Sequence, residues 1–568
     1  MSSIETINQA YIGMLTSDSN TCVEIGLDAN LDQLPDPSME ALTRIGQQAT
    51  KLQKDAQQLA DALSDFHQQL DMQLIALSAG QQVLRCSLRF NDKSQAQQLP
   101  NAGDEISSGI FYLVTNDPRP AEARLGNILA RLQQIPMYLQ KMLARLDTPV
   151  DRWVAIDLET IAGLPDFFET ILKWADEEAF SYRAELAAAI DQANAAMTEY
   201  AKNLSNLPTT SAFAIGAEQA QALVSGNGID LTLAQIHQIA CNFVTTTRQQ
   251  IEELRASLVT KHGLEPSTTA SELQEFLERQ HAVQVTDGNL EQVIERYQSV
   301  SKELETFVKE RSLFPIPDQQ TMNIMQTPDF MAPMIPAGAM MPPPAMRSGV
   351  RTSMVYLTLS PELLKEHTEL GIPLMMVHEG IPGHHLQLST AAMHSSVIRR
   401  TFSANEHAEG WTTMLEDYML DQNLMGNLTD EARFVTKLDL SRIGARVAID
   451  LYFMTDDPGY LDIGYEVAFN DEDPFVNAAK LLIAATGFSA GRAQAELNWY
   501  SQERAYPLSY LVGNHLVWQL KHDFQRATAE TMTADEQDRN FHRIYLESGN
   551  MPVAYLRQVF EHELGQSL

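Results

Sequence analysis

Cysteines, basic residues and long apolar runs are all scarce in this chain of 568 residues. Its three cysteines, Cys22, Cys86 and Cys241, are widely spaced, which argues against a disulfide framework or a thiolate metal site and predicts a reducing compartment. Residues 1–15 contain no basic segment followed by an apolar run, and no stretch approaches the roughly 18 apolar residues of a membrane span. We therefore predict a soluble cytoplasmic protein.

The scarcity of basic residues limits the partners that the protein can have. Acidic residues outnumber basic ones by 74 to 40, which gives a formal net charge of -34. Such a chain repels phosphate backbones and anionic lipid surfaces, so we expect neither nucleic acid nor a membrane as a partner. With 44% hydrophobic and 20% charged residues, the composition is that of a globular protein. The sequence leaves the oligomeric state open.

Most of the chain carries helical patterns. From about residue 39 to residue 311 it is rich in Ala, Leu, Gln and Glu, with apolar residues three and four positions apart. Further helices are predicted to begin at about Ala404, Asp430, Asn477, Gly491 and Arg539. The best strand candidate is the β-branched and apolar run 354–359. The predicted fold class is therefore mainly α with little sheet.

Between Phe314 and Pro344 the sequence interleaves prolines with methionines. So many prolines predict that no regular element forms there, and the methionines favour a loop packed on the protein over a solvated linker. We accordingly divide the chain into a helical amino-terminal part (1–313), a Pro/Met-rich packed loop (314–353) and a carboxy-terminal part that carries the chemistry (354–568). The two large parts are expected to form one continuous body around a cleft.

The most informative segment, residues 377–387, reads VHEGIPGHHLQ. In a His-Glu-x-x-His helix, histidines four residues apart reach one metal ion while the glutamate addresses the metal-bound water. Here the fourth residue after His378 is Pro382, and His384 and His385 follow six and seven positions after His378. The proline and the glycines on either side of it allow a bulge that brings a second histidine to the metal. The spacing does not decide between His384 and His385.

A hydrolytic zinc site needs three protein ligands and an open position for water. We expect the third ligand in the segment 405–411, NEHAEGW, which leads into a predicted helix over 412–421. Glu406 and Glu409 lie one turn apart, so either is a candidate ligand, and the other would then support that ligand without touching the metal. His407 is a weaker candidate. The alternative is an acidic helix start that is favoured by the helix dipole.

The pattern His-Glu-x-x-Pro-Gly-His-His-x-Gln, followed by Glu-Gly-Trp, resembles a bacterial family described as domain of unknown function 885, which is grouped with the zincin-like, gluzincin-type metallopeptidases. The resemblance spans roughly residues 350–568 and includes an Arg-x-x-x-Asp helix at Arg446 and Asp450. It also includes a Glu, Tyr, Pro, Ser-Tyr and Gly block over 496–513. It implies a large multi-helix zincin-like architecture with a small β element beside the metal-binding helix.

The resemblance implies a role for each matching residue. The implied zinc ligands are His378, one of His384 and His385, and Glu409, and the implied base is Glu379. Tyr510, in the Ser-Tyr pair, would stabilise an oxyanion, and the histidine that does not bind metal is the second choice for that role. Two positions depart from the family pattern, because Trp499 replaces an expected arginine and Met454 an expected histidine. These departures bear on substrate selection more than on metal binding.

Two further features suggest how a substrate would bind. Zincins commonly pair a substrate peptide with an edge strand beside the metal helix, and residues 355–359 are the nearby candidate, with Tyr356 as a substrate contact. Arg442 and Arg446 lie four residues apart on one helix face, where they could receive a substrate carboxylate. The alternative for both arginines is a salt bridge within an acidic protein.

These patterns predict a hydrolase with Zn2+ as cofactor that cleaves peptide bonds, in short peptides or peptide-like substrates, through a metal-activated water with Glu379 as base. A non-peptide metallo-amidase would use the same ligands with a different pocket. The third class is a helical interaction protein whose metal site is decayed or structural.

Overall fold

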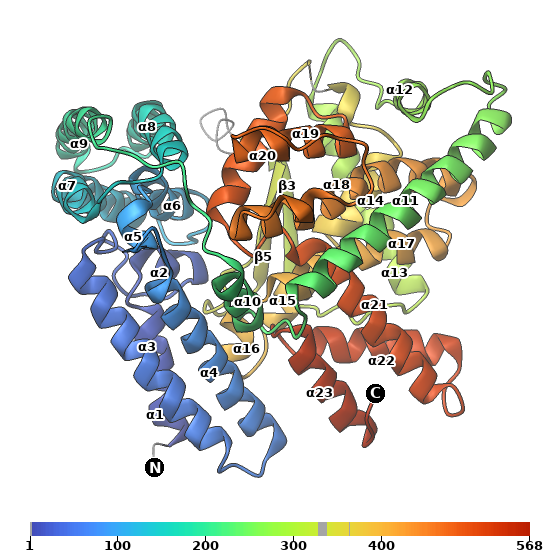
Figure 1. Ribbon diagram of the computed structural model, residues 1–568, viewed down its shortest axis with the longest axis horizontal. Coiled ribbons are helices and arrows are strands. Elements are labelled where there is room, and N and C mark those ends of the chain that lie inside the picture. Colours follow the sequence, from blue (N-terminus) through green and yellow to red (C-terminus); the bar gives the residue numbers. More distant parts are fainter. Residues whose placement is uncertain (1–2, 328–337, 363) are drawn as a thin grey trace. The chain divides into compact units, whose positions relative to one another are not determined.

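The computed structural model describes residues 3–327, 338–362 and 364–568, and its regular structure is mainly helical, as the sequence predicts (Figure 1). The chain forms two compact units. Unit 1 comprises Met1–Asn227, Pro343–Ser348 and Ser395–Phe402, and unit 2 comprises Gly228–Pro342, Gly349–His394 and Ser403–Leu568. This division differs from the boundary expected near residue 313. In the described part of the chain, no helix has the length and apolar character needed to cross a lipid bilayer.

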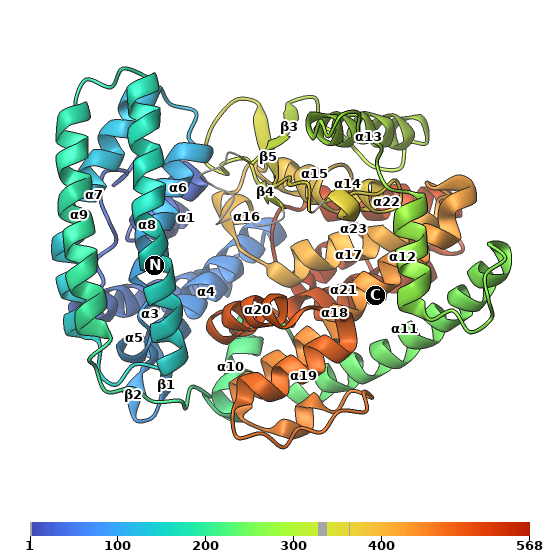
Figure 2. The same ribbon diagram turned by 90° about the horizontal axis from the view of Figure 1, so that it is seen from above.

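Unit 1 consists of helices and one short β-hairpin, in which β1 (Arg89–Phe90) pairs antiparallel with β2 (Lys93–Ser94). Helices α3 and α4 pack as a hairpin, and α7, α8 and α9 lie side by side (Figure 2). The helices of this unit are α1 (Ile4–Leu15), α2 (Ser19–Ile25), α3 (Met39–Ala60), α4 (Phe66–Ser87), α5 (Gln95–Gln98), α6 (Ala102–Thr115), α7 (Ala121–Arg145), α8 (Asp151–Glu177), α9 (Arg183–Leu204), α10 (Ala217–Gly226) and α16 (Val397–Thr401).

Unit 2 contains every residue for which the sequence predicts a chemical role. Its α-helices are α11 (Leu233–Lys261), α12 (Ala270–Gln280), α13 (Glu291–Glu310), α14 (Gly371–Glu379), α15 (His384–Ala391), α17 (Asn405–Asp421), α18 (Thr429–Thr455), α19 (Pro474–Thr486), α20 (Ala490–Gln502), α21 (Ser509–Thr528), α22 (Ala534–Glu547) and α23 (Val553–Leu564). Its 3-10 helices are η1 (Leu364–Glu366), η2 (Gly426–Leu428) and η3 (Pro458–Leu461). Helices α11 and α13 pack on α18 and α14 respectively, which explains why they belong to this unit.

Unit 2 also holds a three-stranded sheet in the order β3–β5–β4, formed by β3 (Gln320–Gln326), β4 (Gly338–Met341) and β5 (Arg351–Leu357). The expectation of no regular element over 314–344 was therefore wrong. The two strands in that segment contain no proline, so the prolines around them interrupt no ladder. Residues 328–337 of the predicted packed loop lie outside the described residues.

Strand β5 confirms the strand predicted near residue 354, but it is the central strand of this sheet. It pairs parallel with β3 and antiparallel with β4, so residues 354–357 are hydrogen-bonded neighbours of a strand on both sides. The expectation that 355–359 offers an edge to a substrate peptide was therefore wrong over these residues. Tyr356 is 4% exposed and lies opposite Met325 on one side and Ala339 on the other.

Helices α17 and α21 pack closely where two glycines meet. A Cβ atom added to Gly410 would overlap the backbone of Gly513, and a Cβ added to Gly513 would overlap the carbonyl of Glu406. The missing side chains therefore let the two helix backbones approach each other. This contact fixes the first half of α17, which carries Glu409, against the start of α21, which carries Tyr510.

We expect Gly410→Ala to lower the free energy of unfolding of unit 2 by about 1–3 kcal/mol, because the added methyl group overpacks this helix crossing. Urea unfolding followed by circular dichroism measures the change. Gly491→Ala is the matched control, since Gly491 lies in α20 with nothing within 4 Å of its added Cβ. The control is expected to be neutral or slightly stabilising. An equally stable Gly410→Ala protein would contradict the importance of the close crossing.

Candidate metal centre

Helix α14 ends at the His-Glu pair, and α15 begins at His384 after a four-residue turn. The helix is apolar and buried, and Pro373 lies in its first turn, where a missing N–H costs no helical hydrogen bond. The turn contains Gly383, and a Cβ atom there would overlap the carbonyl oxygens of Val377 and His378. Only glycine therefore lets the chain fold back over the end of α14 without displacing it.

The folded-back turn places His384 beside His378, with ring centroids 4.9 Å apart and ring planes at 81°. Trp411 holds the turn from α17, because its Nε1–H donates to the Pro382 carbonyl at 3.0 Å and the indole is fully buried. The Glu-Gly-Trp motif thus positions the His-Glu motif. The break that the sequence predicts at Pro382 and Gly383 is present.

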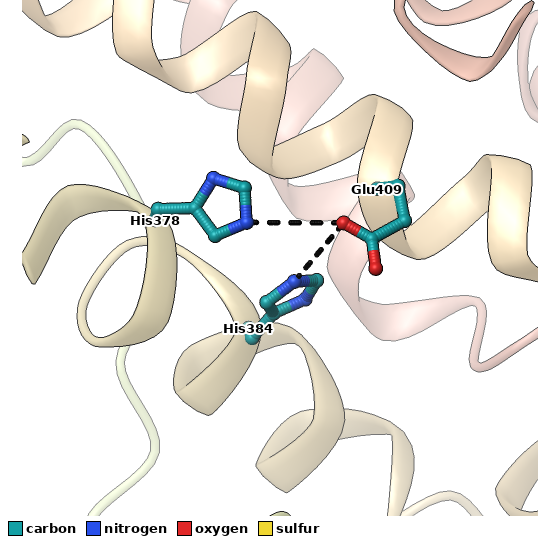
Figure 3. A group of neighbouring side chains, drawn as sticks. All are labelled: His378, His384 and Glu409. Atoms are coloured by element: carbon teal, nitrogen blue, oxygen red, sulfur yellow. Dashed lines mark ion pairs between the residues drawn. The ribbon is translucent and has the colours of Figure 1, made fainter. Parts of the chain in front are cut away.

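Helix α17 brings Glu409 to the two histidines. Its Oε2 lies 3.5 Å from His384 Nε2 and 3.8 Å from His378 Nε2, and Figure 3 shows both rings facing this carboxylate oxygen. One ligand atom from each residue lies within 4.8 Å of those of the other two. His378, His384 and Glu409 are named the HHE cluster below. The sequence left two histidines open for the second position, and the structure brings His384 to it.

Glu409 is an ionised carboxylate in the HHE cluster, and one of its oxygens is buried without a hydrogen-bond partner among the described residues. Burial favours the neutral form of Glu409, but the charges of His384 and His378 outweigh burial and hold the pKa of this carboxyl at about 2. Among the described residues, Glu409 Oε2 and His384 Nδ1 are buried without a hydrogen-bond partner. Buried polar atoms are rarely left unsatisfied, and each such atom costs roughly 1–3 kcal/mol. A metal ion bound by Glu409 would satisfy its orphaned oxygen.

A second carboxylate, Glu416, orients the first histidine. Its Oε1 accepts a hydrogen bond from His378 Nδ1 at 2.7 Å, which leaves Nε2 directed at Glu409. Burial opposes protonation of His378, but this hydrogen bond and the nearby glutamates raise the pKa of His378 to about 9. Metal-binding histidines commonly donate their other N–H to a carboxylate in this way. Sequence reasoning missed Glu416, although its distance of seven residues from Glu409, two helical turns, was an available signal.

We expect Glu416→Gln to weaken zinc binding by about 10- to 100-fold while the fold is kept, because glutamine accepts the hydrogen bond but lacks the charge. Competition with a chromogenic chelator measures the dissociation constant. Asp417→Asn is the matched control, since the neighbouring Asp417 pairs with Arg433 and Lys437 instead. Equal zinc affinities for Glu416→Gln and Asp417→Asn would contradict the orienting role of Glu416.

His385 points away from the HHE cluster and toward the sheet. Its Nδ1 lies 2.8 Å from Ser353 Oγ and its Nε2 lies 2.5 Å from Gln320 Oε1. Burial lowers the pKa of His385 to about 4, so the ring is neutral, accepts from Ser353 and donates to Gln320. His385 therefore ties α15 to β5 and β3, and neither ring nitrogen is directed at the cluster.

Two tyrosines border the HHE cluster on the side of α21. Tyr506 Oη donates to Glu409 Oε1 at 3.3 Å, and the Tyr510 ring lies 5.9 Å from the Tyr506 ring. Burial, reinforced by the charge of Glu409, raises the pKa of Tyr510 to about 12, so its hydroxyl stays a hydrogen-bond donor. Both side chains are partly exposed. Sequence reasoning predicted Tyr510 and missed Tyr506, which precedes α21 and carries no helical spacing signal.

The remaining candidates occupy different places. Glu379 ends α14 next to His378 and is half-buried, while Glu406 is buried and accepts from the Val553 N–H at 3.1 Å. Burial raises the pKa of Glu406 to about 7. His407 packs on Tyr545 with ring centroids 4.5 Å apart. Of these three residues, only Glu379 is the immediate sequence neighbour of a member of the HHE cluster, His378.

The two arginines predicted to meet a substrate differ in their partners. Arg446 is buried and donates to Tyr500 Oη at 2.8 Å and to Glu496 Oε2 at 3.1 Å, so the alternative of an internal salt bridge holds for it. Arg442 pairs with Asp439 on its own helix at 2.9 Å. The residue expected to be an arginine, Trp499, has its ring 5.5 Å from the Arg446 guanidinium.

The fold and the site together define a mainly helical protein with a buried group of two histidines and a glutamate. The chain belongs to the family described as "Bacterial protein of unknown function (DUF885)", which it matches over residues 20–560. This match confirms the family that the motifs resemble, and it extends the likeness into the amino-terminal half. No curated protein matches the chain.

Two solved structures share this fold. A "putative lipoprotein of unknown function" from Shewanella oneidensis superposes with a TM-score of 0.76 at 16% identity, covering 98% of this chain and 100% of its own. A "putative lipoprotein" from Colwellia psychrerythraea gives a TM-score of 0.78 at 16% identity, covering 99% of both chains. These descriptions contradict the cytoplasmic location predicted above, because a lipoprotein is held at a membrane by its lipid. The scattered cysteines do not decide the compartment, since a protein outside the cytoplasm needs no disulfide.

Proposed function

We propose that this protein is a zinc-dependent hydrolase that cleaves peptide bonds in short peptides. The observation that carries the proposal is the HHE cluster, whose ligand atoms lie within 4.8 Å of one another. Two imidazoles and one carboxylate are a donor set of hydrolytic zinc sites, and three protein ligands leave a fourth position open. The carboxylate held on the Nδ1 of His378 is the outer support that such ligands commonly have.

We propose further that the site is zincin-like. The support is local: a His-Glu pair ends one helix, a second histidine returns after a turn, and a glutamate comes from a following helix. The spacing differs from His-Glu-x-x-His, and the turn at Gly383 compensates for the two additional residues. The small sheet lies beside these helices, and the hydrogen bonds of His385 to Ser353 and Gln320 join the two.

Zinc, when bound, would polarise the scissile carbonyl and lower the pKa of water. Glu379 follows His378 directly and would accept the proton of the attacking water and deliver it to the leaving amine. The hydroxyl of Tyr510 stays protonated because burial raises its pKa to about 12, so it can donate to a developing oxyanion. Tyr506 donates its single O–H to Glu409, which fixes the orientation of that carboxylate.

Metal analysis of the purified protein and a hydrolysis screen against a mixed library of short peptides test the proposal. We expect about one zinc per chain and cleavage that a chelator abolishes and added zinc restores. Bound zinc without cleavage of any peptide would favour a metallo-amidase with another substrate. A protein that binds no zinc would favour a helical interaction protein with a decayed site.

A further inference from the structure

Arg442 and Arg446 lie one turn apart on α18, but their guanidinium groups differ in their partners and in their burial. Arg446 is 6% exposed, donates to Tyr500 and Glu496, and has its guanidinium carbon 4.4 Å from the centre of the Tyr510 ring. These contacts enclose the guanidinium. Arg446 therefore supports Tyr510, one of the two tyrosines beside the HHE cluster.

Arg442 has weaker partners. Its Nη1 donates to Asp439 at 2.9 Å, but the Asp439 side chain is 52% exposed, and such exposed pairs contribute little. Its Nε is buried and has no hydrogen-bond partner among the residues that the structure describes. The Arg442 side chain is itself 27% exposed, so a ligand from solvent can reach it. This guanidinium combines an unused buried donor with an accessible edge.

The position of Arg442 relates it to the HHE cluster. Helix α18 packs against α14 and α17, which carry His378 and Glu409. Arg442 lies one turn before Arg446, whose guanidinium contacts the Tyr510 ring, and Tyr510 packs against Tyr506, which bonds to Glu409. Arg442 thus lies one helical turn from a residue that contacts the tyrosines beside the cluster.

We propose that Arg442 receives a substrate carboxylate, so that the preferred substrates are short peptides with a free carboxyl group near the scissile bond. This inference rests on the proposed hydrolytic function and adds the substrate class to it. A planar guanidinium with unused N–H donors binds a carboxylate through two parallel charge-assisted hydrogen bonds. The glutamates around the cluster would otherwise repel an anionic substrate, so a cation at this position is what makes such a substrate acceptable.

The carboxylate has two chemical sources, the peptide C-terminus and an aspartate or glutamate side chain. The peptide library is therefore made in carboxylate and C-terminal amide forms. Binding is measured separately by calorimetry in the Glu379→Gln protein, which should bind without turnover. The probes are trialanine, trialaninamide and Ala-Asp-Ala amide. The variants are Arg442→Gln and Arg442→Lys, with Arg433→Gln as the matched control on the same helix, where Arg433 pairs with Asp417 and Asp421.

We expect Arg442→Gln to raise KM and the trialanine dissociation constant by about 10- to 100-fold, with kcat little changed, because one charged hydrogen-bonding partner is lost. The KM and the trialanine dissociation constant of Arg442→Lys should lie between those of the wild type and those of Arg442→Gln. Arg433→Gln should match the wild type in both. Trialaninamide should bind weakly to all variants. Tight binding of Ala-Asp-Ala amide that is lost in Arg442→Gln would identify a side-chain carboxylate as the ligand.

The outcomes separate the inference from the proposed function. Wild-type protein that cleaves and binds carboxylate and amide forms equally well would overturn the role of Arg442 and leave the hydrolase standing. The same would follow if Arg442→Gln weakened the binding and cleavage of the carboxylate and amide peptides by the same factor. Wild-type protein that cleaves no peptide of either form would contradict the proposed function, and the inference would fall with it. The wild-type comparison remains decisive even where an Arg442 variant fails to fold.

Discussion

Replacing Glu379 with glutamine is expected to leave one zinc bound per chain and to reduce peptide hydrolysis by several orders of magnitude. Glutamine keeps the size of the side chain but cannot take a proton from water, and a positioned general base contributes roughly 10²–10⁴-fold to such a reaction. The loss should appear in kcat and kcat/KM alike, because the proton is transferred only in the transition state. Zinc content by atomic emission and initial rates on the best library peptide provide the two measurements.

Glu303→Gln is the control for this experiment, since Glu303 lies on α13, pairs with Arg296 and is 59% exposed. It should match the wild type in zinc content and rate. A Glu379→Gln protein that keeps its activity would remove Glu379 from the mechanism. A variant that loses its zinc would show that Glu379 supports the ligands instead, and the loss of rate would then say nothing of a base.

The residues of the HHE cluster could be proposed from the sequence because local spacing carries most of the information. His378 and Glu379 are adjacent, the second histidine follows after a short turn, and Glu409 lies near the start of a helix. Local spacing did not distinguish Glu406 from Glu409, which only the family resemblance favoured, nor did it distinguish His384 from His385. That choice depends on the path of the turn at Gly383, which packs against backbone carbonyls of the preceding helix.

Contacts between distant segments account for what the sequence did not predict. Tyr506 reaches Glu409 across 97 residues, and no periodicity connects them. Strand β3 was hidden because the prolines that flank it dominate the composition, whereas its seven residues pair with β5 without interruption. The helical class was predictable, since it rests on patterns repeated along most of the chain. Arg446 shows the limit of motif reasoning, because its partners, not its spacing, decide whether it can meet a substrate.

The second large effect is expected from the two adjacent histidines, which should behave in opposite ways. His384→Ala removes a ligand of the HHE cluster and should weaken zinc binding by more than the 10- to 100-fold expected for an outer support such as Glu416. His385→Gln should retain zinc, because His385 bonds to Ser353 and Gln320 and points away from the cluster. Isothermal titration with zinc compares the two proteins directly.

Thermal unfolding gives an independent readout of the same difference. A ligand that binds only the folded state adds about 4.1 kcal/mol when its free concentration is 1,000 times its dissociation constant. Zinc should therefore raise the melting temperature of the wild type and of His385→Gln, but have little effect on His384→Ala. The His385→Gln protein should be less stable before zinc is added, since a buried imidazole with two partners is replaced. Equal zinc responses in the two variants would mean that the ion is held elsewhere. The bend at Gly383 would then have no role in metal binding.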